Sequence, residues 1–219
     1  MTGYRTLAAP VDLEIPRIKR SRFLAYAAPV SDDAAVRAHL DTVRKAHHAA
    51  RHVCWARVLG RDGADTRARD AGEPGGSAGR PILAAITGRD LTFTTVAVVR
   101  YFGGTKLGVG GLARAYGGAA AAALDRGRVV VVVPSREVHA TVAYGDLDQV
   151  RAFARRREVA EHSAEFGASV DLAWRLPEAD APGFVRALLD ATDGRVRATA
   201  SGVVVEVARP AILPAGEPA

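Results

Sequence analysis

The residues best suited to bind a ligand lie in a glycine-rich stretch between Arg100 and Arg114. Its five glycines are Gly103, Gly104, Gly108, Gly110 and Gly111. Glycine has no Cβ, so it leaves backbone amides accessible and adopts positive φ readily. A helix that begins after such a turn directs unpaired N–H groups, and the positive end of its dipole, at one point. With Arg100, Lys106 and Arg114 beside it, this stretch is predicted to bind phosphate-like anions.

A second glycine-rich segment precedes the short apolar run Ile82–Ile86, which we predict to be a helix with Pro81 in its first turn. Its candidate ligand-binding residues are Gly75, Gly76, Ser77 and Arg80. If the two helix N-termini lie side by side, they would share one positively charged, concave surface. Glu73 is the acid of this segment. It has the chemistry of a general base, but we identify no second carboxylate, nucleophile or metal site to complete a mechanism, so we interpret Glu73 as a residue that holds the loop shut.

Two nucleotide-binding motifs fit this chain only in part. Gly108–Ala113 matches the dinucleotide pattern G-x-G-x-x-A, but the preceding strand ends near Phe102, too early for the tight turn that the motif needs. The next strand, Val129–Val133, ends without an acidic residue for a ribose. A P-loop fails because no Gly-Lys-Ser/Thr follows the first glycine at the required distance. The alternative that the glycines only let helix and sheet pack closely stays open.

Histidines and a cysteine cluster near position 50, and they raise the question of a metal or a reactive thiol. They are His47, His48, His52 and Cys54. His52 and Cys54 lie on one face of a predicted strand, about 7 Å apart. There is no second cysteine and no spacing typical of zinc ligands. We therefore predict no metal, no cofactor and no catalytic residue, and interpret the thiol as a small buried group.

The glycine-rich stretch needs a sheet and helices to position it. Thr94–Val99 is β-branched and predicts a buried strand, and Leu107–Leu124 predicts a helix. Residues 1–18 are predicted to be extended, and the run Lys19–Arg22 to be a solvated edge that leads into a strand. A helix is predicted from Ser31–Asp33 to Ala46. The polar segment Gly60–Gly76 is predicted to be a loop.

The second part of the chain has a different order of elements. Pro134-Ser135 is the predicted domain boundary. The elements expected after it are the strand 137–144, the helix 146–157, the strands 159–166 and 169–176, the helix 179–190 and the strand 202–207. This order is the β-α-β-β-α-β pattern of a ferredoxin-like domain. We predict an α+β protein of two-layer α/β domains: an N-terminal domain (1–134), a ferredoxin-like domain (135–208) and a flexible tail (209–219).

The charge is distributed unevenly. Residues 1–134 carry 20 Lys and Arg against 11 Asp and Glu, whereas residues 135–219 carry 10 against 13. A basic first domain suits a polyanion such as RNA or a ribosomal surface, although an Arg-rich composition alone gives the same excess. A single cysteine, with no signal peptide or membrane span in the sequence, predicts a cytoplasmic protein.

Four blocks of the sequence resemble the YigZ/IMPACT family, in the family's order. They are Lys19–Phe23, Ala50–Cys54, Ala71–Leu83 and Arg100–Leu112. The resemblance is to the bacterial branch, and it implies an N-terminal domain like domain IV of elongation factor G and a C-terminal domain like its domain V. It also implies a role linked to translation. Eukaryotic relatives compete for an activator of a kinase in the response to amino-acid starvation.

These observations lead to one functional prediction and two alternatives. We predict a non-catalytic protein that binds RNA or the ribosome through the basic glycine-rich face, with Tyr101 and Phe102 stacking on bases if they are exposed. The first alternative is a regulator that binds a protein partner without touching RNA. The second is an enzyme that acts on a phosphorylated small molecule.

Overall fold

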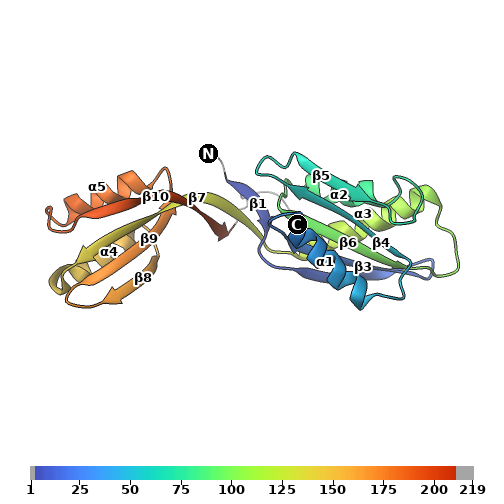
Figure 1. Cartoon of the computed structure of the whole chain (residues 1–219), viewed down its shortest axis with the longest axis horizontal. Helices are drawn as coiled ribbons and strands as arrows, with labels where there is room; N and C mark the ends of the chain where they lie inside the picture. The colour runs from blue at the N-terminus through green and yellow to red at the C-terminus, as the bar shows by residue number, and fades with distance from the viewer. Residues whose placement is uncertain (1–2, 211–219) are drawn as a thin grey trace. The chain divides into compact units, whose positions relative to one another are not determined.

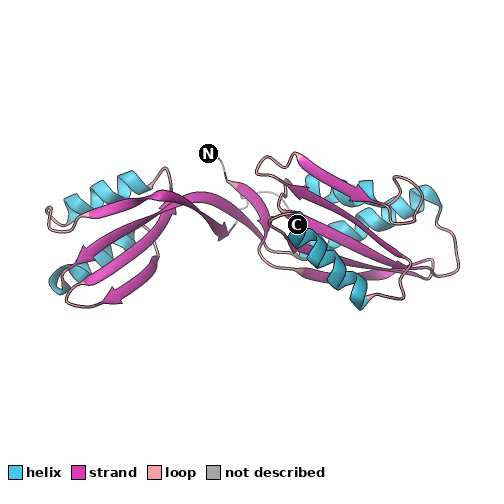
Figure 2. Ribbon diagram, in the orientation of Figure 1, coloured by secondary structure: helices cyan, strands magenta, loops and turns pink. Residues whose placement is uncertain are grey.

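The computed structural model describes residues 3–210. The chain divides into two compact units, Tyr4–Val131 and Val132–Arg209. Figures 1 and 2 show that each unit consists of a β-sheet with helices packed on it. The predicted α+β class is confirmed.

The first unit contains a five-stranded sheet in the order β2-β3-β6-β4-β5, in which each neighbouring pair is antiparallel. Its strands are β2 (Val11–Ile18), β3 (Ser21–Pro29), β6 (Thr94–Tyr101), β4 (His52–Leu59) and β5 (Asp65–Arg69). The central strand β6 is buried from Thr94 to Arg100. Both faces of β6 are covered, which explains why its sequence is almost continuously apolar.

Helices cover both faces of this sheet (Figure 1). On one face, α2 (Gly79–Thr87) and α3 (Gly108–Arg126) pack through Ile82, Leu112 and Tyr116 in the larger apolar core. On the other face, α1 (Asp33–Ala46) packs through Val36, Leu40 and Val43. The side chain of Asp32 caps α1 by accepting a hydrogen bond from the amide of Ala35. The loop that joins β6 to α3 therefore lies at one end of the layer that α2 and α3 form.

The second unit has the predicted β-α-β-β-α-β order. Its elements are β7 (Val129–Val142), the 3₁₀ turn η1 (Tyr144–Asp146), α4 (Leu147–Arg156), β8 (Glu161–Phe166), β9 (Val170–Pro177), α5 (Ala181–Ala191) and β10 (Ala198–Pro210). The sheet is ordered β1-β7-β9-β8, and β10 also pairs with β7. β1 (Tyr4–Leu7) and the first residues of β7, up to Val131, belong to the first unit. Phe153, Trp174 and Phe184 form the aromatic centre of its core.

The structure differs from the predicted elements in three places. β10 spans Ala198–Pro210 instead of 202–207, so residues 209 and 210 of the predicted tail belong to a strand. β7 continues through Pro134, so the predicted strands 129–133 and 137–144 form one strand. Proline is tolerated there because the ladder to β9 begins only at Ser135, so its missing N–H breaks no pair in that ladder. The predicted loop Gly60–Gly76 contains β5, which pairs with β4 at the edge of the described sheet, so a polar sequence can form it. Most of the predicted tail, residues 211–219, lies outside the described residues.

Candidate functional site

The glycine-rich turn is held against the hairpin that joins β2 to β3. A Cβ on Gly103 would lie 2.1 Å from the carbonyl carbon of Arg20 and 2.3 Å from the amide nitrogen of Ser21. The amide of Gly103 donates a hydrogen bond to Oγ of Ser21 at 3.1 Å. At this position glycine is needed because two backbones touch, and its N–H is already used within the protein.

This contact brings a second pair of basic residues to the turn. Lys19 and Arg20 form the tip of the β2–β3 hairpin, with φ of 46° and 67°. Both are exposed, and Nη2 of Arg20 donates to Oγ1 of Thr105 at 3.2 Å. We had interpreted the Lys19–Arg22 run only as a solvated edge. Its relation to the glycines depends on a contact across more than 80 residues, which no local pattern reveals.

The two segments that meet here contain no acidic residue. Residues 15–31 and 91–124 have neither Asp nor Glu, and they carry Arg17, Lys19, Arg20, Arg22, Arg100, Lys106 and Arg114. Of these cations, Arg22 is paired with Glu14 of the neighbouring strand. Lys106 and Arg114 are exposed. Lys19 and Arg20 of the hairpin tip, Lys106 and Arg114 beside the glycines, and the turn 102–108 together form what we call the basic turn; Arg17, also exposed, lies on β2 before the hairpin tip and is not included.

The first turn of α3 is open to solvent. Its N-cap residue is Leu107, whose side chain has no hydrogen-bonding group. Gly104 and Gly108 have φ of 87° and 71°, and the space where their Cβ atoms would stand is empty. Nη1 of Arg114 lies 3.7 Å from the Cβ position of Gly110, so this guanidinium folds back over the start of its own helix. The first turn of α3 is therefore accessible, with one guanidinium beside it.

Arg100 does not belong to the basic turn. Its side chain is 6% exposed and that of Glu73 is 4% exposed, and Nη1 of Arg100 donates to Oε1 of Glu73 at 2.7 Å. The hydroxyl of Tyr116 donates to the same oxygen at 2.7 Å. Glu73 therefore ties the loop before α2 to β6 and to α3, as the structural interpretation predicts. The charge of Arg100 is balanced inside the protein.

Cys54 adjoins this buried network. Its thiol is fully buried and donates to the carbonyl oxygen of Asp70 at 2.8 Å. Burial raises the pKa of Cys54 to about 12, and burial also raises the pKa of Tyr116. Neither group ionises near neutral pH, so neither is an activated nucleophile or base in this structure.

The N-terminus of α2 is closed by a carboxylate that the sequence analysis missed. Asp70 accepts hydrogen bonds from the amides of Gly76, Ala78 and Gly79 at 2.8 to 2.9 Å. Burial works to raise the pKa of Asp70, but these three amides and the charge of Arg80 outweigh it, so the pKa lies below its usual value. The anion that this helix end attracts is part of the chain itself.

The other predicted residues of this segment are used in the same closed loop. The buried hydroxyl of Ser77 donates to the carbonyl oxygen of Pro74 at 2.6 Å. Gly76 has φ of 76°, and the side chain of Arg80 lies 3.3 Å from its Cβ position. Gly75 and Arg80 are exposed. Only these two remain accessible among the candidates on this loop.

The helices α2 and α3 are parallel neighbours, but their first turns are offset along the helix axis. Pro81, in the first turn of α2, lies 3.4 Å from the Cβ position of Gly117, in the middle of α3. Further along, Nε of Arg89 donates to Oδ1 of Asp125 at 2.8 Å. At 1.5 Å per residue, α3 extends about 10 Å beyond the start of α2. The two N-termini thus lie on one face of the sheet without converging on one point.

Tyr101 and Phe102 have different surroundings, as expected for neighbours at a strand end. The hydroxyl of Tyr101 hydrogen-bonds Nδ1 of His47 at 2.9 Å on the α1 face. Phe102 is 57% exposed. Only Phe102 is therefore accessible for stacking.

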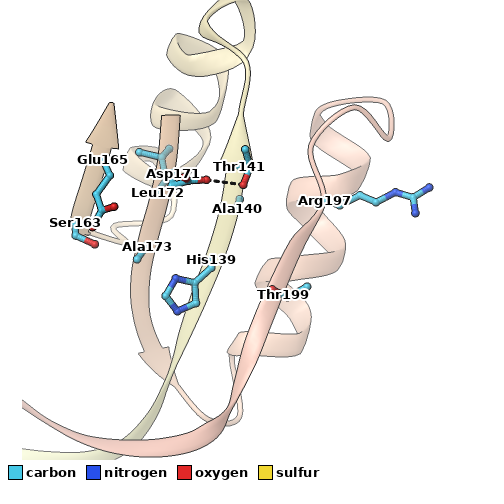
Figure 3. Close-up of a pocket in the computed structure, with 10 residues that line it drawn as sticks. All are labelled: His139, Ala140, Thr141, Ser163, Glu165, Asp171, Leu172, Ala173, Arg197 and Thr199. Atoms are coloured by element: carbon cyan, nitrogen blue, oxygen red, sulfur yellow. Dashed lines mark hydrogen bonds between the residues drawn. The ribbon is translucent and has the colours of Figure 1, made fainter. Parts of the chain in front are cut away.

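The second unit has a groove of about 520 Å³ on its sheet, drawn in Figure 3. Asp171 and Glu165 face each other across β8 and β9, and Thr141 donates a hydrogen bond to Asp171. Arg197, the residue before β10, lines the groove but extends away from the other side chains (Figure 3). With carboxylates at its centre, this groove lacks the uniform positive charge of the basic turn.

Two further observations limit the chemistry of the described residues. Within residues 3–210, no three His, Cys, Asp or Glu side chains are grouped as ligands for a metal ion. No helix in the described part of the chain combines the length and the apolar character needed to span a membrane.

Comparison with known proteins identifies relatives along most of the chain. A family profile for the Impact N-terminal domain matches residues 19–124, and one for a domain of unknown function, DUF1949, matches residues 141–195. The chain is 35% identical over 199 residues to the IMPACT family member YigZ of Escherichia coli (strain K12), covering 90% of this chain and 97% of that protein.

Two other relatives agree with this assignment. An IMPACT family member encoded in the pol 5′ region of Thermus thermophilus is 41% identical over 180 residues, which cover 82% of this chain and 97% of the relative. A solved structure, described as the crystal structure of a hypothetical protein, superposes with a TM-score of 0.61 at 34% identity, covering 92% of this chain and 98% of that one. The resemblance found in the sequence motifs is confirmed, and this chain belongs to the IMPACT family.

Proposed function

We propose that this protein is a cytoplasmic, translation-linked factor that binds RNA, alone or on the ribosome, through the basic turn. The observation that carries the proposal is the meeting of two acid-free segments at Gly103, which gathers Lys19, Arg20, Lys106 and Arg114 around exposed backbone. Phosphates are the anions that a cluster of lysines, arginines and free amides at a helix N-terminus recognises.

The N-terminus of α2 supports the choice of the basic turn as the RNA-binding surface, because the amides at the start of α2 are paired inside the protein. Asp70 and Glu73 neutralise the α2 terminus and Arg100 from within, so of the four cations predicted to bind anions only Arg80, Lys106 and Arg114 remain exposed. A catalytic alternative receives no support from the buried network, since Cys54 and Tyr116 are held in their protonated forms.

The test is RNA binding measured by fluorescence anisotropy over a salt series from about 50 to 200 mM. The parent protein is expected to bind a fluorescent RNA oligonucleotide with an affinity that falls steeply with salt. The double variant Lys106→Glu, Arg114→Glu is expected to lose at least about tenfold in affinity, and its salt slope to fall by roughly 1.4 to 1.8, for two phosphate contacts.

A matched control separates this local effect from the change in net charge. Arg37 and Lys45 are exposed cations eight residues apart on α1, as Lys106 and Arg114 are on their segment, but α1 covers the opposite face of the sheet. The variant Arg37→Glu, Lys45→Glu has the same net charge and should bind RNA nearly as the parent does. Equal losses in both variants, or no binding by the parent at low salt, would contradict the proposal.

A further inference from the structure

Phe102 is a large apolar side chain exposed within the basic turn. It is 57% exposed and directly precedes Gly103, whose backbone touches Arg20. An exposed phenylalanine alone is ordinary on a protein surface. Phe102, however, lies in the basic turn. Through the contact of Gly103 with Arg20, it is close to the cations that the proposed function assigns to phosphates.

The ring of Phe102 is held in place by a contact with the side chain of Arg100. The guanidinium carbon of Arg100 lies 5.4 Å from the centroid of the Phe102 ring, within the range of a cation–π contact. That guanidinium cannot move freely, because Nη1 is bound to the buried Glu73. Nε of Arg100 is buried with no hydrogen-bond partner among the described residues, so the group stays there without a full set of polar contacts. The ring is thus oriented by the buried network and still largely open to solvent.

We infer that Phe102 is a stacking platform for an unpaired base, and that the basic turn therefore selects single-stranded over double-stranded RNA. This inference rests on the proposed function. In a duplex the bases are stacked on each other, so an exposed aromatic ring gains no partner and only the phosphate contacts remain. In a single strand each base offers a π-face to an aromatic side chain beside a basic groove.

The experiment compares one single-stranded RNA of about twelve nucleotides with the same strand annealed to its complement. The parent is expected to bind the single strand more tightly at equal salt. Phe102→Ala should lower the affinity for the single strand by about 5- to 100-fold, the range for loss of one stacked base. It should leave the duplex affinity and the salt slope unchanged, because no cation is removed.

Two further variants separate stacking from folding and from general apolar contact. Phe102→Trp should keep the single-strand affinity, and the fluorescence of the introduced indole should be quenched by the single strand but not by the duplex. Val109→Ala removes the other large exposed apolar side chain of the first unit's described residues and should change neither affinity. Circular dichroism checks that each variant folds as the parent does.

The outcomes distinguish the inference from the proposed function. If the parent binds both RNAs equally and Phe102→Ala alters neither affinity, stacking is refuted while phosphate binding stands. If neither RNA binds at low salt, the proposed function fails, and this inference fails with it.

Discussion

The helices α2 and α3 both begin after glycine-rich segments, yet one N-terminus is closed and the other is open. At α2, Asp70 receives three amide hydrogen bonds. At α3, the N-cap is Leu107, whose side chain makes no capping hydrogen bond. Two glycine-rich segments of similar composition therefore differ in one respect: an internal carboxylate satisfies the helix N-terminus at α2, and none does so at the N-cap of α3.

The largest effect on stability is expected from removing the carboxylate of Asp70 at the N-terminus of α2. Asp70→Ala removes the acceptor of three buried or half-buried amides, and we expect it to lower the free energy of unfolding by about 3 kcal/mol. Urea unfolding followed by circular dichroism measures the change, and hydrogen exchange at Gly76, Ala78 and Gly79 should accelerate. Asp41→Ala, which removes an exposed ion pair with Arg44, is the control and should cost less than about 1 kcal/mol. Equal effects of the two substitutions would mean that Asp70 does not hold α2.

Lowering the pH is expected to have an intermediate effect on stability, through protonation of Asp70. The pKa of Asp70 is lower in the folded than in the unfolded chain, so its stabilising contribution is complete above the unfolded value, near pH 4, and is lost as the pH falls through the folded pKa. Urea midpoints measured from about pH 5 to pH 2 should therefore fall more steeply for the parent than for Asp70→Asn. Parallel curves would contradict this assignment.

The smallest effect on stability should come from adding a carboxylate at the N-terminus of α3. Val109→Asp places a carboxylate in the first turn of α3, where it should raise the free energy of unfolding by about 0.3 to 1 kcal/mol. The same charge should weaken RNA binding, because it occupies the position proposed for a phosphate. Val109→Asn has a similar size without the charge and is the control for both measurements. A carboxylate that stabilised α3 without reducing RNA affinity would show that RNA binds elsewhere.

Several parts of the site could be predicted from the sequence because their signals are local. The continuous apolar run predicts β6, and the glycines that follow it predict the start of α3. Asp70 was missed because capping rules look for an acceptor at the N-cap itself, and this carboxylate lies six to nine residues before the amides that it binds. An acid that directly precedes a glycine-rich turn is the signal that would have found it.

Periodicity, composition and turn residues in the sequence determined most of the order of elements and the sign of the charge in the first domain. The resemblance of four sequence blocks indicated the family and the fold class that it implies. Only the tertiary structure decided which cations are available. Arg100 is neutralised by Glu73, 27 residues away, while Arg20 reaches the glycine-rich turn across 85 residues. Burial and pairing depend on which surfaces the chain brings together, and that is a property of packing between distant segments.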